Sequence, residues 1–185
     1  IAVETMMSLQ ETRAALIAAK EVCQLPVIVT LTFEGDGKTL YGTDAKTAAV
    51  VLEKLGASAI GANCSTGPDQ MTDLIGTIAE VVSVPVIAKP NAGLPSLNAQ
   101  GETVYDMDEK AFTEGMRSLV LAGASIVGGC CGTSPSYIRA IADDLKGRGA
   151  GLMASRRRSE GSGCGVRYLT SERKCVSFDL DSPFL

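Results

Sequence analysis

The stretch SAIGANCSTGPDQMTDLIGTIAEVVSVPVIAKP, residues 58–90, contains a complete strand–helix–strand repeat. Residues 58–64 form a short apolar run that ends at the turn-forming residues 65–68. Residues 69–83 then place apolar side chains at helical spacing, and residues 84–90 form a second apolar run. Strands that are apolar throughout and joined by helices form parallel sheets covered by helices. This stretch therefore predicts an α/β protein.

The same alternation extends in both directions and gives five units within the first 147 residues. The predicted strand and helix pairs are 1–5 with 9–24, 26–33 with 44–56, 58–64 with 69–83, 84–90 with 108–123, and 124–130 with 136–147. Periodicity does not decide between an open doubly wound sheet and a closed barrel. Because an eight-unit barrel needs ~250 residues, a barrel interpretation expects three further units upstream of Ile1.

The character of the sequence changes after Gly147. Residues 148–165 are rich in Gly, Ser and Arg, which is typical of a linker. We therefore expect a compact domain over 1–147, with a linker and tail over 148–185 that contains one strand over 166–179. The basic cluster Arg156, Arg157 and Arg158 has no interleaved aromatic residues and is expected to be a solvated part of the tail.

Composition excludes several classes of function. The chain has 185 residues, 45% hydrophobic content and a formal net charge of −4, so it lacks the basic footprint of a protein that binds nucleic acid or an anionic membrane. No apolar run approaches the ~18 residues of a membrane span, and the start does not resemble a signal peptide. These features predict a cytoplasmic protein.

Cysteines mark the carboxyl ends of two predicted strands. Cys64 ends the third strand, and the adjacent pair Cys130 and Cys131 ends the fifth. Loops at the carboxyl ends of parallel strands converge on one face, where binding and chemistry occur. We expect the other cysteines to be a packing residue in a helix and two incidental thiols in the tail: Cys23, Cys164 and Cys175.

Several chemistries are compatible with these three strand-end cysteines. Buried packing is common for cysteine, whereas a disulfide within the adjacent pair would be strained. A cysteine nucleophile usually needs a base such as His, and the chain contains no His. Three thiolates suit zinc and leave a fourth tetrahedral position open, as in catalytic zinc sites. The spacing leaves packing and metal binding as equal alternatives.

Longer motifs add a resemblance. GANCSTGPDQM (61–71), KPNAGLP (89–95) and GGCCGTSPSYIRAIA (128–142) resemble the homocysteine S-methyltransferase family, and most of all the homocysteine-binding module of its cobalamin-dependent methionine synthases. The resemblance implies a (β/α)8 TIM barrel, of which this chain supplies about the last five βα units. The tail YLTSERKCVSFD (168–179) is similar to the family's connector. The Asp-Gly motif of the family's first strand does not occur here.

The resemblance also assigns roles to residues. It implies a zinc ion held by Cys64, Cys130 and Cys131, with Glu4 binding the amino group of homocysteine and Asn63 facing the substrate. Without the resemblance, Glu4 is expected to cap backbone groups and Asn63 to form a turn. We expect Lys89, which precedes Pro90, to shape its loop rather than contact the substrate.

The reaction that the resemblance implies is zinc-dependent methylation of the homocysteine thiol, which gives methionine. Methylcobalamin would be the donor, recharged from methyltetrahydrofolate, and both would bind modules outside this chain. Two alternatives remain: a relative that uses betaine or S-methylmethionine as donor, and a zinc-thiolate or redox domain without methyl transfer.

Overall fold

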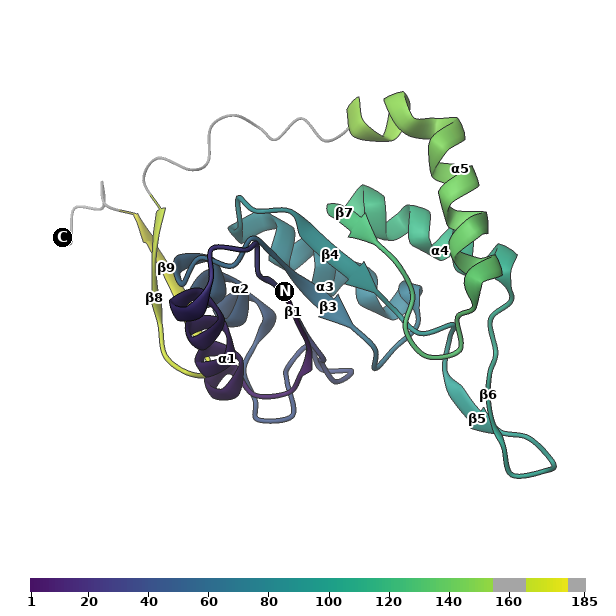
Figure 1. Ribbon diagram of the computed structural model, residues 1–185, viewed down its shortest axis with the longest axis horizontal. Coiled ribbons are helices and arrows are strands. Elements are labelled where there is room, and N and C mark those ends of the chain that lie inside the picture. Colours follow the sequence, from purple (N-terminus) through teal and green to yellow (C-terminus); the bar gives the residue numbers. More distant parts are fainter. Residues whose placement is uncertain (155–165, 180–185) are drawn as a thin grey trace.

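A computed structural model describes residues 1–154 and 166–179 of the chain, and it contains the five expected strand–helix units (Figure 1). The units are β1 (Ala2–Met6) and α1 (Leu9–Val22), β2 (Ile28–Leu31) and α2 (Ala45–Lys54), β3 (Ala59–Asn63) and α3 (Pro68–Val81), β4 (Val86–Lys89) and α4 (Glu109–Ala122), and β7 (Ala124–Val127) and α5 (Pro135–Ala154). The predicted α/β alternation is confirmed.

These five strands form one parallel sheet in the order β1-β2-β3-β4-β7. Each neighbour in the sheet is also the next unit along the chain, which is the arrangement that right-handed strand–helix–strand crossovers produce when all helices cover one face. Consecutive helices accordingly pack against one another from α1 to α5. All strand carboxyl ends therefore lie along one edge of the sheet.

Three of the helices begin after a residue whose side chain caps them. Ser8, Asp44 and Asp108 cap α1, α2 and α4, each with a side-chain oxygen that accepts a backbone N–H two or three residues into the helix. Pro68 and Pro135 occupy the first positions of α3 and α5, where the missing proline N–H leaves no helical hydrogen bond unmade.

The core lies between the helical layer and the central strands. Its largest fully buried side chains include Phe112, Leu16, Leu52 and Ile75. The Phe112 ring packs edge-on against Tyr137 with the ring centroids 5.5 Å apart, and this contact joins α4 to α5. Every residue of β3 is buried, as expected for a strand with neighbours on both sides and side chains covering both faces.

The two outer strands differ from the central ones. Among the described residues, no further strand pairs with the outer edge of β1 or β7. Both strands carry exposed residues, and Ile126 of β7 is 42% exposed. The five strands thus form an open sheet with two free edges.

Two additional hairpins depart from the sequence expectations. The predicted long loop after β4 contains the antiparallel pair β5 (Pro95–Leu97) and β6 (Thr103–Tyr105), which projects from the body of the chain (Figure 1). The expectation of one strand over 166–179 is wrong. The segment forms β8 (Val166–Thr170) and β9 (Cys175–Asp179), because Ser171 closes a turn in which its N–H donates to the Lys174 carbonyl at 2.8 Å.

The expected end of the last helix at Gly147 is also wrong, because α5 continues to Ala154. Glycine weakens a helix interior without excluding helical backbone angles. The boundary predicted at 147 therefore falls inside a helix, and the division into 1–147 and 148–185 stays a prediction. Arg156, Arg157, Arg158 and Cys164 lie outside the described residues.

The tail hairpin returns to the body of the chain. The Thr43 hydroxyl donates to the Glu172 carbonyl at 2.9 Å, and the Asp44 N–H donates to the Arg173 carbonyl at 3.4 Å. The hairpin thus lies against the loop that precedes α2. Within the described part of the chain, no helix combines the length and the apolar character needed to cross a bilayer.

Candidate metal centre

Three cysteine sulfurs meet at the carboxyl edge of the sheet. Cys64 directly follows β3, while Cys130 and Cys131 lie in the loop after β7. Their Sγ atoms all lie within 4.8 Å of one another, and those of Cys64 and Cys131 are 3.8 Å apart. Cys64 and Cys130 are half-buried and Cys131 is exposed. A group of this composition and spacing can hold a metal ion.

The end of β4, which lies between β3 and β7, fixes the two cysteine-bearing loops. The Cys64 N–H donates to the Lys89 carbonyl at 3.0 Å, and the Cys130 N–H donates to the Pro90 carbonyl at 2.8 Å. Two consecutive carbonyls of one strand end thus position cysteines that are 66 residues apart in the sequence. This pairing explains how remote residues form one cluster.

The side of the cluster around Cys131 is formed by the loop after β4 and by β6. The side-chain oxygen of Asn91 accepts the Cys131 N–H at 3.1 Å. Gly132 has a φ of +78°, and a Cβ there would lie 2.4 Å from the Tyr105 ring. Glycine is therefore required where the aromatic ring of the hairpin covers the backbone next to Cys131.

Asn63 connects the cluster to the rest of the sheet. Its side-chain oxygen accepts hydrogen bonds from the Thr5 N–H at 3.0 Å and the Thr30 hydroxyl at 2.6 Å. Its amide nitrogen donates to the Thr5 hydroxyl at 2.9 Å and to the Cys130 Sγ at 3.7 Å. Asn63 is only 2% exposed, so its amide is buried and engaged on both sides.

Left-handed backbone conformations occur beside this network. Thr5, Cys64 and Ser65 have φ values of 60°, 64° and 62°, a region that non-glycine residues rarely adopt. Such conformations cost about 1–3 kcal/mol each and persist where the surroundings fix them. At Thr5, both the N–H and the hydroxyl are held by Asn63.

The thiols differ in acidity. Burial raises the pKa of the Cys64 thiol to about 11, although a hydrogen bond from the Ser65 N–H opposes this effect. Burial also acts to raise the pKa of Cys131, but hydrogen bonds from the Cys64 thiol and the Tyr105 hydroxyl prevail, and the pKa falls below its ordinary value. Without a metal, Cys131 thus ionises before Cys64.

An ion pair lies at the same edge of the sheet. The Lys89 ammonium group, at the end of β4, pairs with the Glu4 carboxylate of β1. Their side chains are 26% and 51% exposed. The sequence singled out Glu4 and expected Lys89 to shape a loop, but it did not predict that the two side chains meet.

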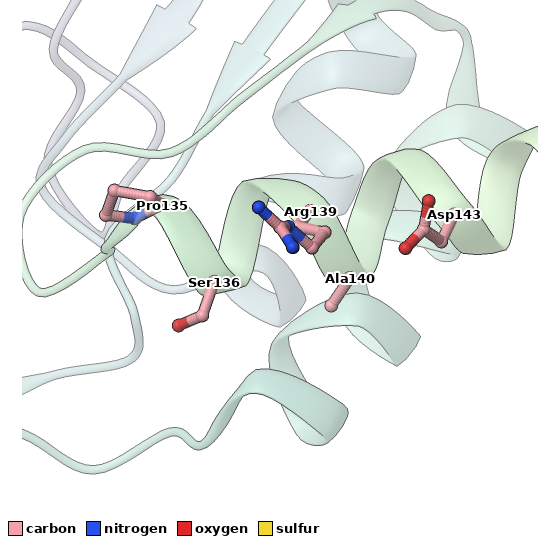
Figure 2. Close-up of a pocket in the computed structure, with 5 residues that line it drawn as sticks. All are labelled: Pro135, Ser136, Arg139, Ala140 and Asp143. Carbon is pink, nitrogen blue, oxygen red and sulfur yellow. The ribbon is translucent and has the colours of Figure 1, made fainter.

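The remaining described cysteines lie elsewhere. Cys23 follows α1 as its C-cap residue, and its thiol donates to the Ala19 carbonyl at 3.3 Å; its packing role stays a prediction. Cys175 lines a pocket of about 610 Å³ between the loop after β2 and α3. A smaller pocket of about 360 Å³ lies along α5 and is lined by Pro135, Ser136, Arg139, Ala140 and Asp143 (Figure 2). Neither pocket is lined by a cysteine of the cluster.

Comparisons with known proteins identify the family. The family profile described as homocysteine S-methyltransferase matches residues 1–145. Methionine synthase from Mycobacterium leprae (strain TN) is 35% identical over 148 residues, which cover 77% of this chain and 12% of the relative. The methionine synthase of Mycobacterium tuberculosis (strain ATCC 25618 / H37Rv) matches with the same identity and coverage. The chain thus spans only 12% of the length of these relatives.

Solved structures agree at the level of the fold. The metallated form of the homocysteine methyltransferase MmuM from Escherichia coli superposes with a TM-score of 0.62 at 19% sequence identity, over 77% of this chain and 44% of that chain. At this identity the match supports a shared arrangement of strands and helices. Together with the family profile over residues 1–145 and the 35% identity to the two methionine synthases, it shows that the chain belongs to the homocysteine S-methyltransferase family.

Proposed function

We propose that this chain is the homocysteine-binding part of an enzyme that methylates the thiol of homocysteine and forms methionine. The observation that carries the proposal is the cluster of three sulfurs, within 4.8 Å of one another, at the carboxyl edge of the sheet. That edge is where chemistry takes place in parallel βα folds. The family membership supports the same reaction.

We further propose that the five units are part of a (β/α)8 barrel. Sequential strand order, with each outer strand paired on one side among the described residues, is what an incomplete barrel presents. The similarity to MmuM, of which this chain covers 44%, supports this interpretation. Closure would require further βα units between β7 and β1, supplied by chain outside these 185 residues.

Zinc is the ion that we propose for the cluster. Three sulfur donors at this spacing fit a soft or borderline metal and not magnesium or calcium. Cys64, Cys130 and Cys131 would hold it, and three protein ligands leave a fourth tetrahedral position for a substrate. When bound, zinc supplies the charge that keeps a coordinating thiol deprotonated at neutral pH.

The protein's own residues would then orient the reactants. Asn63 restrains Cys130 through its amide N–H and fixes the end of β1 through Thr5. We propose that Glu4, at that end of β1, binds the ammonium group of homocysteine. In the reaction, the substrate sulfur forms a bond to the methyl carbon, the bond from the donor to that carbon breaks, and the thiol proton is released to solvent.

The methyl donor would bind another part of the protein. The methionine synthases that the chain resembles are far longer than the matched region, which covers 12% of them. This difference leaves room for modules that bind methylcobalamin and methyltetrahydrofolate, as we propose.

Free thiols at all the described cysteines agree with a reducing compartment such as the cytoplasm.

Zinc K-edge X-ray absorption of the zinc-loaded chain tests this function. We expect three sulfur ligands without substrate and four after L-homocysteine is added, because the substrate sulfur should enter the open position. L-homoserine, which has oxygen in place of sulfur, is the control and should leave the sulfur count unchanged. An unchanged shell with homocysteine would instead favour a thiol or redox domain, for which the 3.8 Å contact between Cys64 and Cys131 is the supporting observation.

A further inference from the structure

The ion pair between Glu4 and Lys89 spans the sheet edge that carries the cysteines. Glu4 lies in β1 and Lys89 ends β4, so the pair bridges over the ends of β2 and β3. The Lys89 side chain passes over Gly128, where its Cγ would lie 3.4 Å from an added Cβ. A Cβ at position 128 would thus be in van der Waals contact with the lysine that reaches across.

Hydrogen bonds connect the strand ends that carry Lys89 and Glu4 to the sulfur cluster. The carbonyl of Lys89 accepts the N–H of Cys64 at 3.0 Å. On the other side, the residue after Glu4 is Thr5, which is bound by Asn63, and the Asn63 amide reaches the Cys130 sulfur at 3.7 Å. The strand ends that carry the pair are thus tied to the cluster by two separate sets of hydrogen bonds.

The chemistry of the substrate matches these two charges. Homocysteine is an amino-acid thiol, which carries an ammonium group and a carboxylate at one end and a sulfur at the other. If its sulfur lies at the cysteine cluster, its charged end must lie nearby. The ion pair offers one anion and one cation there, and the sequence expectations assign a role only to the anion.

The pair can also open readily. Both side chains are partly exposed, at 26% for Lys89 and 51% for Glu4, and ion pairs of this kind contribute little to stability. When substrate binds, its carboxylate would replace Glu4 beside Lys89, and its ammonium group would replace Lys89 beside Glu4. Each side chain would therefore still have an oppositely charged partner. Without substrate, each of the two side chains keeps an oppositely charged partner.

We propose that Lys89 binds the carboxylate of the amino-acid thiol substrate, while Glu4 takes its ammonium group. This inference rests on the proposed function, since it requires homocysteine to place its sulfur at the cysteine cluster. It makes Lys89 a specificity-determining residue that discriminates amino-acid thiols from simple aminothiols. This role differs from the loop-shaping role that the sequence predicts for Lys89.

Binding of two probes to the zinc-loaded 185-residue chain tests the proposal. L-homocysteine carries both charges, and 3-aminopropane-1-thiol lacks only the carboxylate. By isothermal titration calorimetry, Lys89→Met should bind L-homocysteine about tenfold more weakly, because one charge-assisted hydrogen bond is lost. Its affinity for 3-aminopropane-1-thiol should not fall, and Lys89→Arg should retain most of the preference for L-homocysteine.

Glu4→Gln provides the matched control. It should weaken binding of both ammonium-bearing probes and leave the affinity for 4-sulfanylbutanoate, which lacks the ammonium group, unchanged. Zinc stoichiometry and far-ultraviolet circular dichroism confirm that each variant is folded and loaded.

Two results would overturn the proposal. Equal loss for both probes in Lys89→Met would mean that the lysine acts on the site as a whole, and no loss for either would mean that it does not contact the substrate. In both cases wild-type binding of L-homocysteine would leave the proposed function standing. A zinc-loaded wild-type chain that binds no homocysteine would refute the proposed function and this inference with it.

Discussion

Replacement of Asn63 by alanine tests whether one buried amide holds the site together. The side chain is 2% exposed and makes four hydrogen bonds, to both polar groups of Thr5, to Thr30 and to Cys130. Alanine removes all of them. The buried Thr30 hydroxyl then loses its Asn63 partner at a place where water has little access, and the partly buried Thr5 N–H loses the same partner.

The magnitude follows from the groups left behind. A buried donor without a partner costs about 1–3 kcal/mol, and the Thr5 N–H is only partly buried, so we expect a loss of about 3 kcal/mol in the free energy of unfolding. That is a large share of the ~5–15 kcal/mol that stabilises a typical domain. Zinc affinity should fall about 10–100-fold, since the amide N–H also supports a proposed ligand, Cys130.

Urea unfolding of the metal-free chain measures the stability loss, and competition with a chelator measures zinc affinity. Thr30→Val is the matched variant, because it removes only one hydroxyl and should cost about 1 kcal/mol. In a chain that already carries Asn63→Ala, Thr30→Val should cause almost no further loss in the free energy of unfolding. The two substitutions would then have a coupling energy of about 1 kcal/mol. Strict additivity, or a loss below about 1 kcal/mol for Asn63→Ala, would refute the role that we assign to the network.

Three further predictions concern the metal, its pH dependence and the core. Cys130→Ala should release zinc whereas Cys23→Ala, at the distant end of α1, should keep it; one zinc per chain measured in Cys130→Ala by atomic absorption would contradict the ligand set. Burial raises the pKa of Cys64 to about 11, so zinc must displace the proton of this thiol when it binds. Zinc affinity should therefore rise with pH, by up to about tenfold per pH unit for each proton released. Chelator competition that shows the same zinc affinity at every pH would contradict this prediction. Phe112→Ala, at a fully buried site, should lose about 3–5 kcal/mol in urea unfolding and Phe112→Leu clearly less, and equal losses would argue against a packing role.

The fold could be predicted where burial dictates the local pattern. The central strands are apolar because side chains cover both faces, and every residue of β3 is buried. The hairpin β5–β6 escaped prediction because Pro95–Leu97 is exposed throughout and carries no apolar alternation. The break at Ser171 was missed because a side-chain-supported turn leaves no periodic signal.

The site was predictable only in part, for a different physical reason. Strand-end cysteines can be found from the sequence because parallel strands share a carboxyl edge. Asn63 could be singled out, but its partners Thr5 and Thr30 lie 58 and 33 residues away in the sequence, and local patterns carry no information on such contacts. The partnership of Glu4 with Lys89 spans 85 residues and was hidden for the same reason.

The backbone itself provides an independent argument for where the chemistry lies. All the described non-glycine residues with positive φ, Thr5, Cys64 and Ser65, occur at the ends of β1 and β3. Glycine would relieve the strain at each position, yet at Thr5 it would remove the hydroxyl that Asn63 binds, and at Cys64 it would remove a sulfur of the cluster. Glycine would adopt these backbone angles at a lower cost in free energy. A residue with a side chain at such a position therefore indicates that the atoms of that side chain are needed there. The strain therefore marks the same edge of the sheet as the three sulfurs, without reference to any relative.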